Sequence, residues 1–243
     1  MDIVCYQRLT MTSLLLLVPF ILVVAFIVAN RAVYEINSRN GYYCAASPGL
    51  AGSTTEKIGA AQALFSINNF CWASGLVLLK GVRYRITLTI PEDQPDWFDY
   101  DIHTDVEGFP STVSLVHVIA APARRWWTAW WFKPIARIGT RGSDEYTLNP
   151  ILPLPPLAQG EAHGEVVPIK QPDHFKPIDI ASAECVPTRT GRRQLISELM
   201  ARSSGELFLY VNDAALTVRP GWPSDGNYPN NFGTARVVVE RAE

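Results

Sequence analysis

The hydrophobic pattern of the chain changes character between its N-terminal segment and the rest. Residues 14–29 form an apolar run without a charged residue. Together with residues 11–13 this run is long enough to cross the hydrocarbon core of a bilayer as a helix. Beyond residue 71 the apolar residues recur in short runs separated by Pro, Gly and polar turns, which is typical of β-strands. The pattern predicts one transmembrane helix followed by an all-β domain.

The N-terminal run has features of an uncleaved membrane anchor. It is longer than the apolar region of a usual signal peptide, and Asn30-Arg31 follows it in place of a small-residue cleavage site. Pro19 is tolerated in a membrane helix. We therefore expect residues 1–36 to form an anchor that contacts the membrane through residues 11–29, with a cleaved signal peptide as the alternative. Basic residues flank the run on both sides, so its orientation stays open.

Several later stretches have the composition of strands. Residues 98–107 alternate strictly between polar and apolar positions and predict one continuous strand. Residues 113–121 fit either a strand or a short helix, and residues 189–202 have helical character. Further strands are predicted at residues 76–79, 84–90, 135–139, 206–211 and 234–240.

Two segments interrupt this pattern. Residues 37–70 are expected to be a tether that leads into the β domain, with little structure up to residue 55. Residues 56–70 within it fit a short helix or a first strand. Residues 150–188 are Pro-rich, which excludes a helix or a central strand and predicts an excursion over the surface. The β domain is thus expected to span residues 71–243.

Composition and charge exclude several functions. Of the 243 residues, 48% are hydrophobic and 11% aromatic, so the chain can bury a core, and a net charge of −2 offers no basic excess for nucleic acid. None of the catalytic motifs G-x-S-x-G, P-loop or H-E-x-x-H occurs, and we expect no enzyme. The cysteines lack zinc spacing. A Cys44–Cys71 disulfide is the first expectation for Cys44, Cys71 and Cys185, and free buried thiols are the alternative.

Polar side chains mark the ends of the two last predicted strands. Asn212-Asp213 follow the first of them, and Asn230-Asn231 precede the second. If the two strands form a closing hairpin, these side chains meet at one rim. Carboxylate, amide and carbonyl oxygens are what a hard cation such as Ca²⁺ requires. The alternative is turn chemistry, for which Asn and Asp are equally suited.

A second polar group lies along the predicted strand at residues 98–107. Asp99, Asp101, His103 and Asp105 would share one face of that strand. Alternate side chains on a strand stand about 7 Å apart, so one ion would reach two of them at most. We therefore prefer a solvated strand face to a metal site here.

Aromatic residues concentrate at one place in the chain. Residues 123–133 contain four of the seven Trp, flanked by Arg124, Arg125 and Lys133. Three interpretations stay open: a membrane-interface or partner-docking surface, stacking on a sugar, or packing in the core. The four Trp are Trp126, Trp127, Trp130 and Trp131.

The end of the chain resembles the closing motif of PA-IL-type galactophilic lectins. The resemblance is carried by ELFLYVND…NYPNNFGTARVVV, and GVRYRITLTI and PIARIGTRG follow the same order upstream. It covers about residues 71–240 without the Pro-rich excursion. It implies an all-β fold, namely an antiparallel galactose-binding-like (jelly-roll type) β-sandwich behind the membrane helix.

The resemblance also implies a Ca²⁺ site at which the ion bridges protein and sugar. Asp213, Asn230 and Asn231 would provide side-chain ligands and Asn227 a backbone carbonyl, with a further carbonyl from residues 97–100. The loop after Asp213 is longer than in these lectins and would cover or replace the sugar position. The expected ligand or partner surface comprises Trp97, Tyr100, Trp126, Trp127, Trp130, Trp131 and Trp222.

Two functions therefore compete at this stage. The first is a non-enzymatic, membrane-anchored binding module outside the cytoplasm, periplasmic if the source is bacterial, which binds carbohydrate with Ca²⁺. The alternative is an accessory subunit of a larger membrane complex that uses the lectin-like sandwich as a docking surface. Weak Ca²⁺ sites fill where calcium is near millimolar, which favours the extracytoplasmic side.

Overall fold

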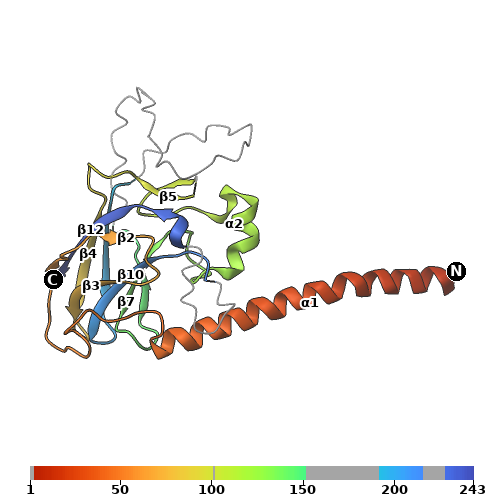
Figure 1. The fold of residues 1–243 in the computed structure, drawn as a ribbon, viewed down its shortest axis with the longest axis horizontal. Coiled ribbons are helices and arrows are strands. Elements are labelled where there is room, and N and C mark those ends of the chain that lie inside the picture. The colour runs from red at the N-terminus through yellow and green to blue at the C-terminus, as the bar shows by residue number, and fades with distance from the viewer. Residues whose placement is uncertain (1–2, 101, 152–191, 216–227) are drawn as a thin grey trace, which may run out of the picture.

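The N-terminal helix extends away from a β-rich domain at the other end of the molecule (Figure 1). This computed structural model describes residues 3–100, 102–151, 192–215 and 228–243. Helix α1 spans Ile3–Asn40 and is apolar and long enough to cross a membrane over Leu17–Asn40, with a mean hydropathy of 2.1. The helix therefore continues four residues past the anchor expected at residues 1–36 and reaches the β domain.

One antiparallel sheet has the strand order β3-β10-β7-β8. Its central strand β10 is buried on both faces: Leu207, Leu209 and Val211 point into the main core, whereas Tyr210 packs against Ile135 on the opposite face. The strands are β3 (Trp72–Leu78), β10 (Gly205–Val211), β7 (Pro134–Ile138) and β8 (Glu145–Thr147).

The second antiparallel sheet has the order β1-β12-β4-β9, and β2 also pairs with β12. A smaller sheet of order β11-β5-β6 stands beside it. The strands of these two sheets are β1 (Gly59–Ala60), β2 (Phe65–Ser66), β4 (Arg83–Thr89), β9 (Gln194–Met200), β12 (Thr234–Arg241), β5 (Trp97–Asp99), β6 (Ile102–Thr104) and β11 (Asn231–Phe232). The short helices are η1 (Ser111–Val113), α2 (Leu115–Ala120), η2 (Ala121–Ala123) and η3 (Tyr228–Asn230).

The two larger sheets share one hydrophobic core. Strand β4 shows why: Tyr84, Ile86 and Leu88 recur at period two and are fully buried, while Arg83 and Arg85, which alternate with them, are exposed. These side chains meet the inward residues of β10 in the same cluster. Burying one such Leu or Ile side chain contributes about 1.5–3 kcal/mol, so this alternation holds the two sheets together. An antiparallel β domain behind one apolar helix is thus confirmed.

The prediction of one strand over residues 98–107 was wrong. The chain reverses after Asp99, where Tyr100 takes a left-handed backbone conformation with φ of 56°. Strands β5 and β6 then pair with each other, with Trp97 opposite Thr104. Asp99 is consequently buried whereas His103 is exposed, so these side chains do not form the solvated face that was expected.

The predicted helix at residues 189–202 was also wrong, because its described part forms strand β9. Leu195 and Leu199 are four residues apart, which fits a helix face, but Ser197 between them is buried as well. That gives period two, and β9 pairs with β4 along its whole length. The closing hairpin was wrong too, since β10 and β12 belong to different sheets.

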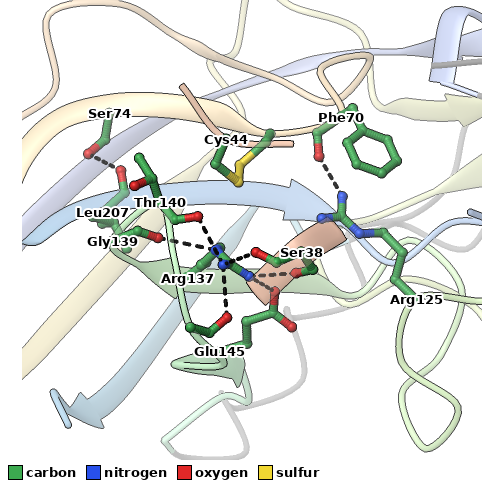
Figure 2. Close-up of a disulfide and its surroundings, with 12 residues drawn as sticks. Ser38, Cys44, Phe70, Ser74, Arg125, Arg137, Gly139, Thr140, Glu145 and Leu207 are labelled. Atoms are coloured by element: carbon green, nitrogen blue, oxygen red, sulfur yellow. Dashed lines mark hydrogen bonds and ion pairs between the residues drawn. A yellow bond between two sulfur atoms is a disulfide. The ribbon is translucent and has the colours of Figure 1, made fainter. Parts of the chain in front are cut away.

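Residues 37–55 were expected to be a tether with little structure, and residues 41–55 contain neither helix nor strand, but several contacts hold the segment to the domain. Residues 37–40 end α1, and Arg137 donates hydrogen bonds to Ser38 (Figure 2). A disulfide joins Cys44 to Cys71, as first expected, with their Cα atoms 5.3 Å apart. The backbone and side chain of Ser47 both donate to Glu206. The segment is therefore fastened to the sheet.

The structure decides between helix and strand for two segments whose assignment the sequence left open. Residues 115–120 are the helix α2, and residues 56–70 contain the short strands β1 and β2 rather than a helix. Most of the Pro-rich excursion predicted at residues 150–188 lies outside the described residues.

Candidate cation site

Two carboxylates and two amides meet where β5 and β11 pair and β10 ends. Asn231 stands opposite Asp99 in the β11–β5 register. Its Nδ2 donates to Oδ2 of Asp213 over 3.0 Å, and Nδ2 of Asn230 donates to Oδ1 of Asp99 over the same distance. The structure thus brings Asp213, Asn230 and Asn231 together as predicted, although the two closing strands do not pair. Asn227 lies outside the described residues.

These polar side chains are almost completely removed from solvent. Asp213 is 4% exposed, Asp99 8% and Asn231 0%. Among the described residues, Oδ1 of Asn230 and Oδ1 of Asn231 are buried without a hydrogen-bond donor. A buried acceptor left unsatisfied costs about 1–3 kcal/mol, so such atoms point to a partner that completes them.

The charge of Asp213 is unfavourable in these surroundings. The pKa of Asp213 is raised to about 7, chiefly by burial and in smaller part by the negative charge of Asp99, against the hydrogen bond from Asn231 and the charge of Arg125. Two carboxylates close together in a medium of low dielectric repel each other. A bound cation would attract both of them.

The donor set fits a hard cation. Carboxylate and amide oxygens are the ligands that Ca²⁺ prefers, and the unpartnered Oδ1 atoms are of this kind. Asp99, Asp213, Asn230 and Asn231 are the residues that would hold the ion. Across the described residues, no group of three or more His, Cys, Asp or Glu side chains could hold a metal. A site here therefore depends on its amides as much as on its carboxylates.

A histidine fixes the carboxylate of Asp99 from outside this group. Nε2 of His117 lies 3.0 Å from Oδ2 of Asp99, and its Nδ1 lies 2.6 Å from Oγ of Ser114. The ring of His117 packs edge-on against Phe109 and Trp131. Both oxygens of Asp99 are thus held in place, one by His117 and the other by Asn230.

This Ser, His and Asp series has the composition of a hydrolytic triad, but Ser114 has a structural role. It is the N-cap of α2, and its Oγ accepts a hydrogen bond from the backbone N–H of His117. A serine three residues before the N–H that donates to it is a common helix cap. We therefore interpret Ser114 and His117 as groups that orient Asp99.

Two of the aromatic residues predicted at the binding surface belong to the core instead. Trp97 is fully buried, and its Nε1 donates to the carbonyl of Thr234. Trp131 is 2% exposed, and its Nε1 donates to Oγ of Ser111. Each indole buries its ring and satisfies its single donor inside the domain, so the prediction of an exposed position was wrong for both.

The other aromatic residues differ in their surroundings. Tyr100 is 68% exposed and adjoins the site, because its N–H donates to the carbonyl of Asn230. Trp126 is half-buried and donates to Glu145, while Trp127 and Trp130 are exposed. Trp222 lies outside the described residues.

Sequence reasoning missed the role of Asn212, next to Asp213. This side chain is fully buried, and its Oδ1 accepts from the N–H of Trp126. Its Nδ2 lies within 3.1 Å of the carbonyls of Trp126, Ala129 and Trp130. Asn212 therefore fixes the loop of residues 126–130 to the end of β10. An Asn next to an Asp does not indicate in the sequence which loop its side chain will bind.

No family model, no curated protein and no solved structure matches this chain. Its function is therefore inferred from the geometry of the site.

Proposed function

We propose that this protein is a non-enzymatic, membrane-anchored binding module outside the cytoplasm that binds carbohydrate through a Ca²⁺ ion. The ion would be held by Asp99, Asp213, Asn230 and Asn231 on a galactose-binding-like sandwich. The observation that carries the proposal is the pair of buried carboxylates beside two buried amide oxygens without donors.

A Ca²⁺ ion would stabilise both the buried carboxylates and the amide oxygens without donors. The charge of the ion offsets both the burial of the Asp213 carboxylate and its repulsion by Asp99, which raise the pKa of Asp213. Its six to eight oxygen ligands would include the amide oxygens of Asn230 and Asn231. Two sugar hydroxyls would complete the shell, as the resemblance to the galactophilic lectins implies. Tyr100 is exposed beside the site, where a sugar ring could pack on it.

The membrane anchor is supported by the way α1 joins the domain. Nδ2 of Asn30 donates to the carbonyl of Ala215 over 2.9 Å, directly after the apolar run. Tyr34 and Ser38, one and two turns further on, are buried in the domain. Because the end of α1 is part of the folded domain, these contacts favour an anchor that stays attached over a cleaved signal peptide.

The first experiment measures calcium binding by the full chain in nanodiscs after treatment with a chelator. We expect 1 mM Ca²⁺ to raise the melting temperature and to give a titration by calorimetry. Asp213→Asn should remove both effects, because it removes a charged ligand. Asp93→Asn is the matched control, since Asp93 lies in an exposed loop. A wild-type protein that does not respond to Ca²⁺ would contradict the metal site.

The second experiment tests the ligand with galactose and mixed-glycan matrices. Retention in Ca²⁺ and release by a chelator are expected for the wild type and for Asp93→Asn. Binding of Ca²⁺ without retention on any glycan would overturn the carbohydrate part and leave the metal site in place. Stable co-purification with other membrane proteins would then favour the accessory-subunit alternative.

A further inference from the structure

Helix α2 presents an apolar surface outside the domain. Leu115, Val116 and Ile119 are 70–73% exposed, and Val118 is 49% exposed. The only polar side chain inside the helix is His117, which turns inward to Asp99. Residues 111–123 contain no Asp, Glu, Lys or Arg. Contiguous large aliphatic side chains are rarely left in water, so this surface points to an apolar contact.

Helix α2 lies close to the residues of α1 that follow its apolar run. It continues directly into η2, which contacts α1. Immediately after η2, the carbonyls of Arg124 and Arg125 accept hydrogen bonds from Arg31. Arg31 lies two residues past the apolar run of residues 14–29. Figure 1 shows α2 on the side of the domain that faces the N-terminal half of α1.

Two exposed tryptophans extend the same surface. Trp127 and Trp130 are about half exposed and follow η2 by a few residues. The guanidinium of Arg31 lies 5.8 Å from the ring centre of Trp127, and Arg124 donates to the Trp127 carbonyl. Tryptophan and arginine are enriched where a bilayer meets water, because each combines an apolar body with a polar group.

We propose that α2, Trp127 and Trp130 form a second membrane contact, with the aliphatic side chains of α2 inserted into the outer part of the bilayer that α1 crosses. This inference rests on the membrane anchoring in the proposed function. It assigns the surface to lipid, because α2 continues into η2, which contacts α1, and because Arg31, just past the uncharged apolar run, bonds to the residues that follow η2. Residues 111–123 also carry no Asp, Glu, Lys or Arg side chain that insertion would have to remove from water.

The test uses nitroxide labels on the full chain, reconstituted in vesicles of phosphatidylcholine and phosphatidylglycerol at a ratio of about three to one. Cys5→Ser and Cys185→Ser leave the Cys44–Cys71 disulfide intact. Labels are placed on α2 through Ile119→Cys or Val116→Cys, at positions whose side chains are exposed. Val24→Cys reports on α1, and Gln194→Cys on the exposed edge of the domain is the aqueous control.

Collision with oxygen and with a water-soluble nickel complex then gives the depth of each label. We expect both α2 labels to resemble Val24→Cys, with oxygen access several-fold above nickel access, and Gln194→Cys to show the reverse. Labels on α2 that are open to nickel while Val24→Cys is protected would overturn the second contact and leave the anchor intact. Protection of α2 from both reagents would overturn it in favour of a protein contact. An aqueous Val24→Cys would overturn the anchor and this inference together.

Discussion

Asp213 gives the clearest prediction at the scale of single residues. Burial, assisted by the charge of Asp99, raises the pKa of Asp213 to about 7 from an ordinary value of 3.8. An unfolded chain therefore loses this proton at lower pH than the folded protein does. The stability contribution of Asp213 is complete below about pH 4 and is lost as the pH rises through about 7.

The corresponding measurement is denaturant unfolding of the full chain in calcium-free buffer between pH 4 and 8. Relative to Asp213→Asn, the wild type should lose up to about 4 kcal/mol of stability over this range, at 1.36 kcal/mol per pKa unit. Asparagine has the same shape and does not titrate. Two curves that stay parallel with pH would show that Asp213 is not held protonated.

The candidate site was predictable in part from its residue types. Asp213, Asn230 and Asn231 were chosen because oxygen-bearing side chains flank two predicted strands, and the hydrogen bond between Asp213 and Asn231 confirms that they meet. Asp99 was assigned to a solvated face, because alternation alone cannot reveal that Tyr100 reverses the chain. The inward position of His117 depends on the N-cap at Ser114, which is visible only once α2 is known to be a helix.

At the scale of elements, the end of α1 is held by a buried arginine of β7. The guanidinium of Arg137 donates to Oγ and to the carbonyl of Ser38, in the last turn of α1 (Figure 2). It also pairs with Glu145 at 2.6 Å and bonds to the carbonyls of Gly139 and Thr140. Carbonyls in the last turn of a helix lack a partner within the helix, and that of Ser38 accepts from the N–H of Gly41 and from Arg137. Arg137 therefore joins the end of α1 to the sheet.

Replacing this arginine should loosen the helix from the domain. We expect Arg137→Met to lower the free energy of unfolding by about 3–5 kcal/mol, because Glu145 would lose its buried ion-pair partner. Arg85→Met is the control: Arg85 pairs with Glu198 at the surface, where the loss should stay below about 1 kcal/mol. Equal losses in the two variants, measured by chemical denaturation, would contradict this role of Arg137.

The strands differ in how far the sequence could predict them. Strands β4, β7, β10 and β12 were predicted, because each has an apolar or alternating run that ends in a turn. Strand β9 was mistaken for a helix, since Leu195 and Leu199 satisfy both periods and only pairing with β4 decides between them. The partners of β10 and β12 could not be predicted, because the choice of sheet depends on contacts far apart in the chain.

At the scale of the whole molecule, the Cys44–Cys71 disulfide joins the segment after α1 to the start of β3. It closes a loop with a sequence separation of 27 residues, for which a loss of about 3–4 kcal/mol is expected on removal. Cys44→Ser with Cys71→Ser should lower the melting temperature, and Cys185→Ser should not. A disulfide of this kind persists in an oxidising compartment, as expected outside the cytoplasm. Free thiols at both positions in protein from its native membrane would contradict that location.

The direct attachment of α1 to the domain also limits the positions that the candidate site can take. Asn30, Arg31 and Ser38 are each bonded to the domain, so no flexible linker separates the anchor from the candidate site. If α1 spans a membrane, as proposed, the candidate site is held at one height above the bilayer. Copies that diffuse in the same membrane present their sites in a common plane and in the same sense. A ligand with several identical groups at that height could engage many copies at once, and avidity would arise from lateral density without any contact between the proteins.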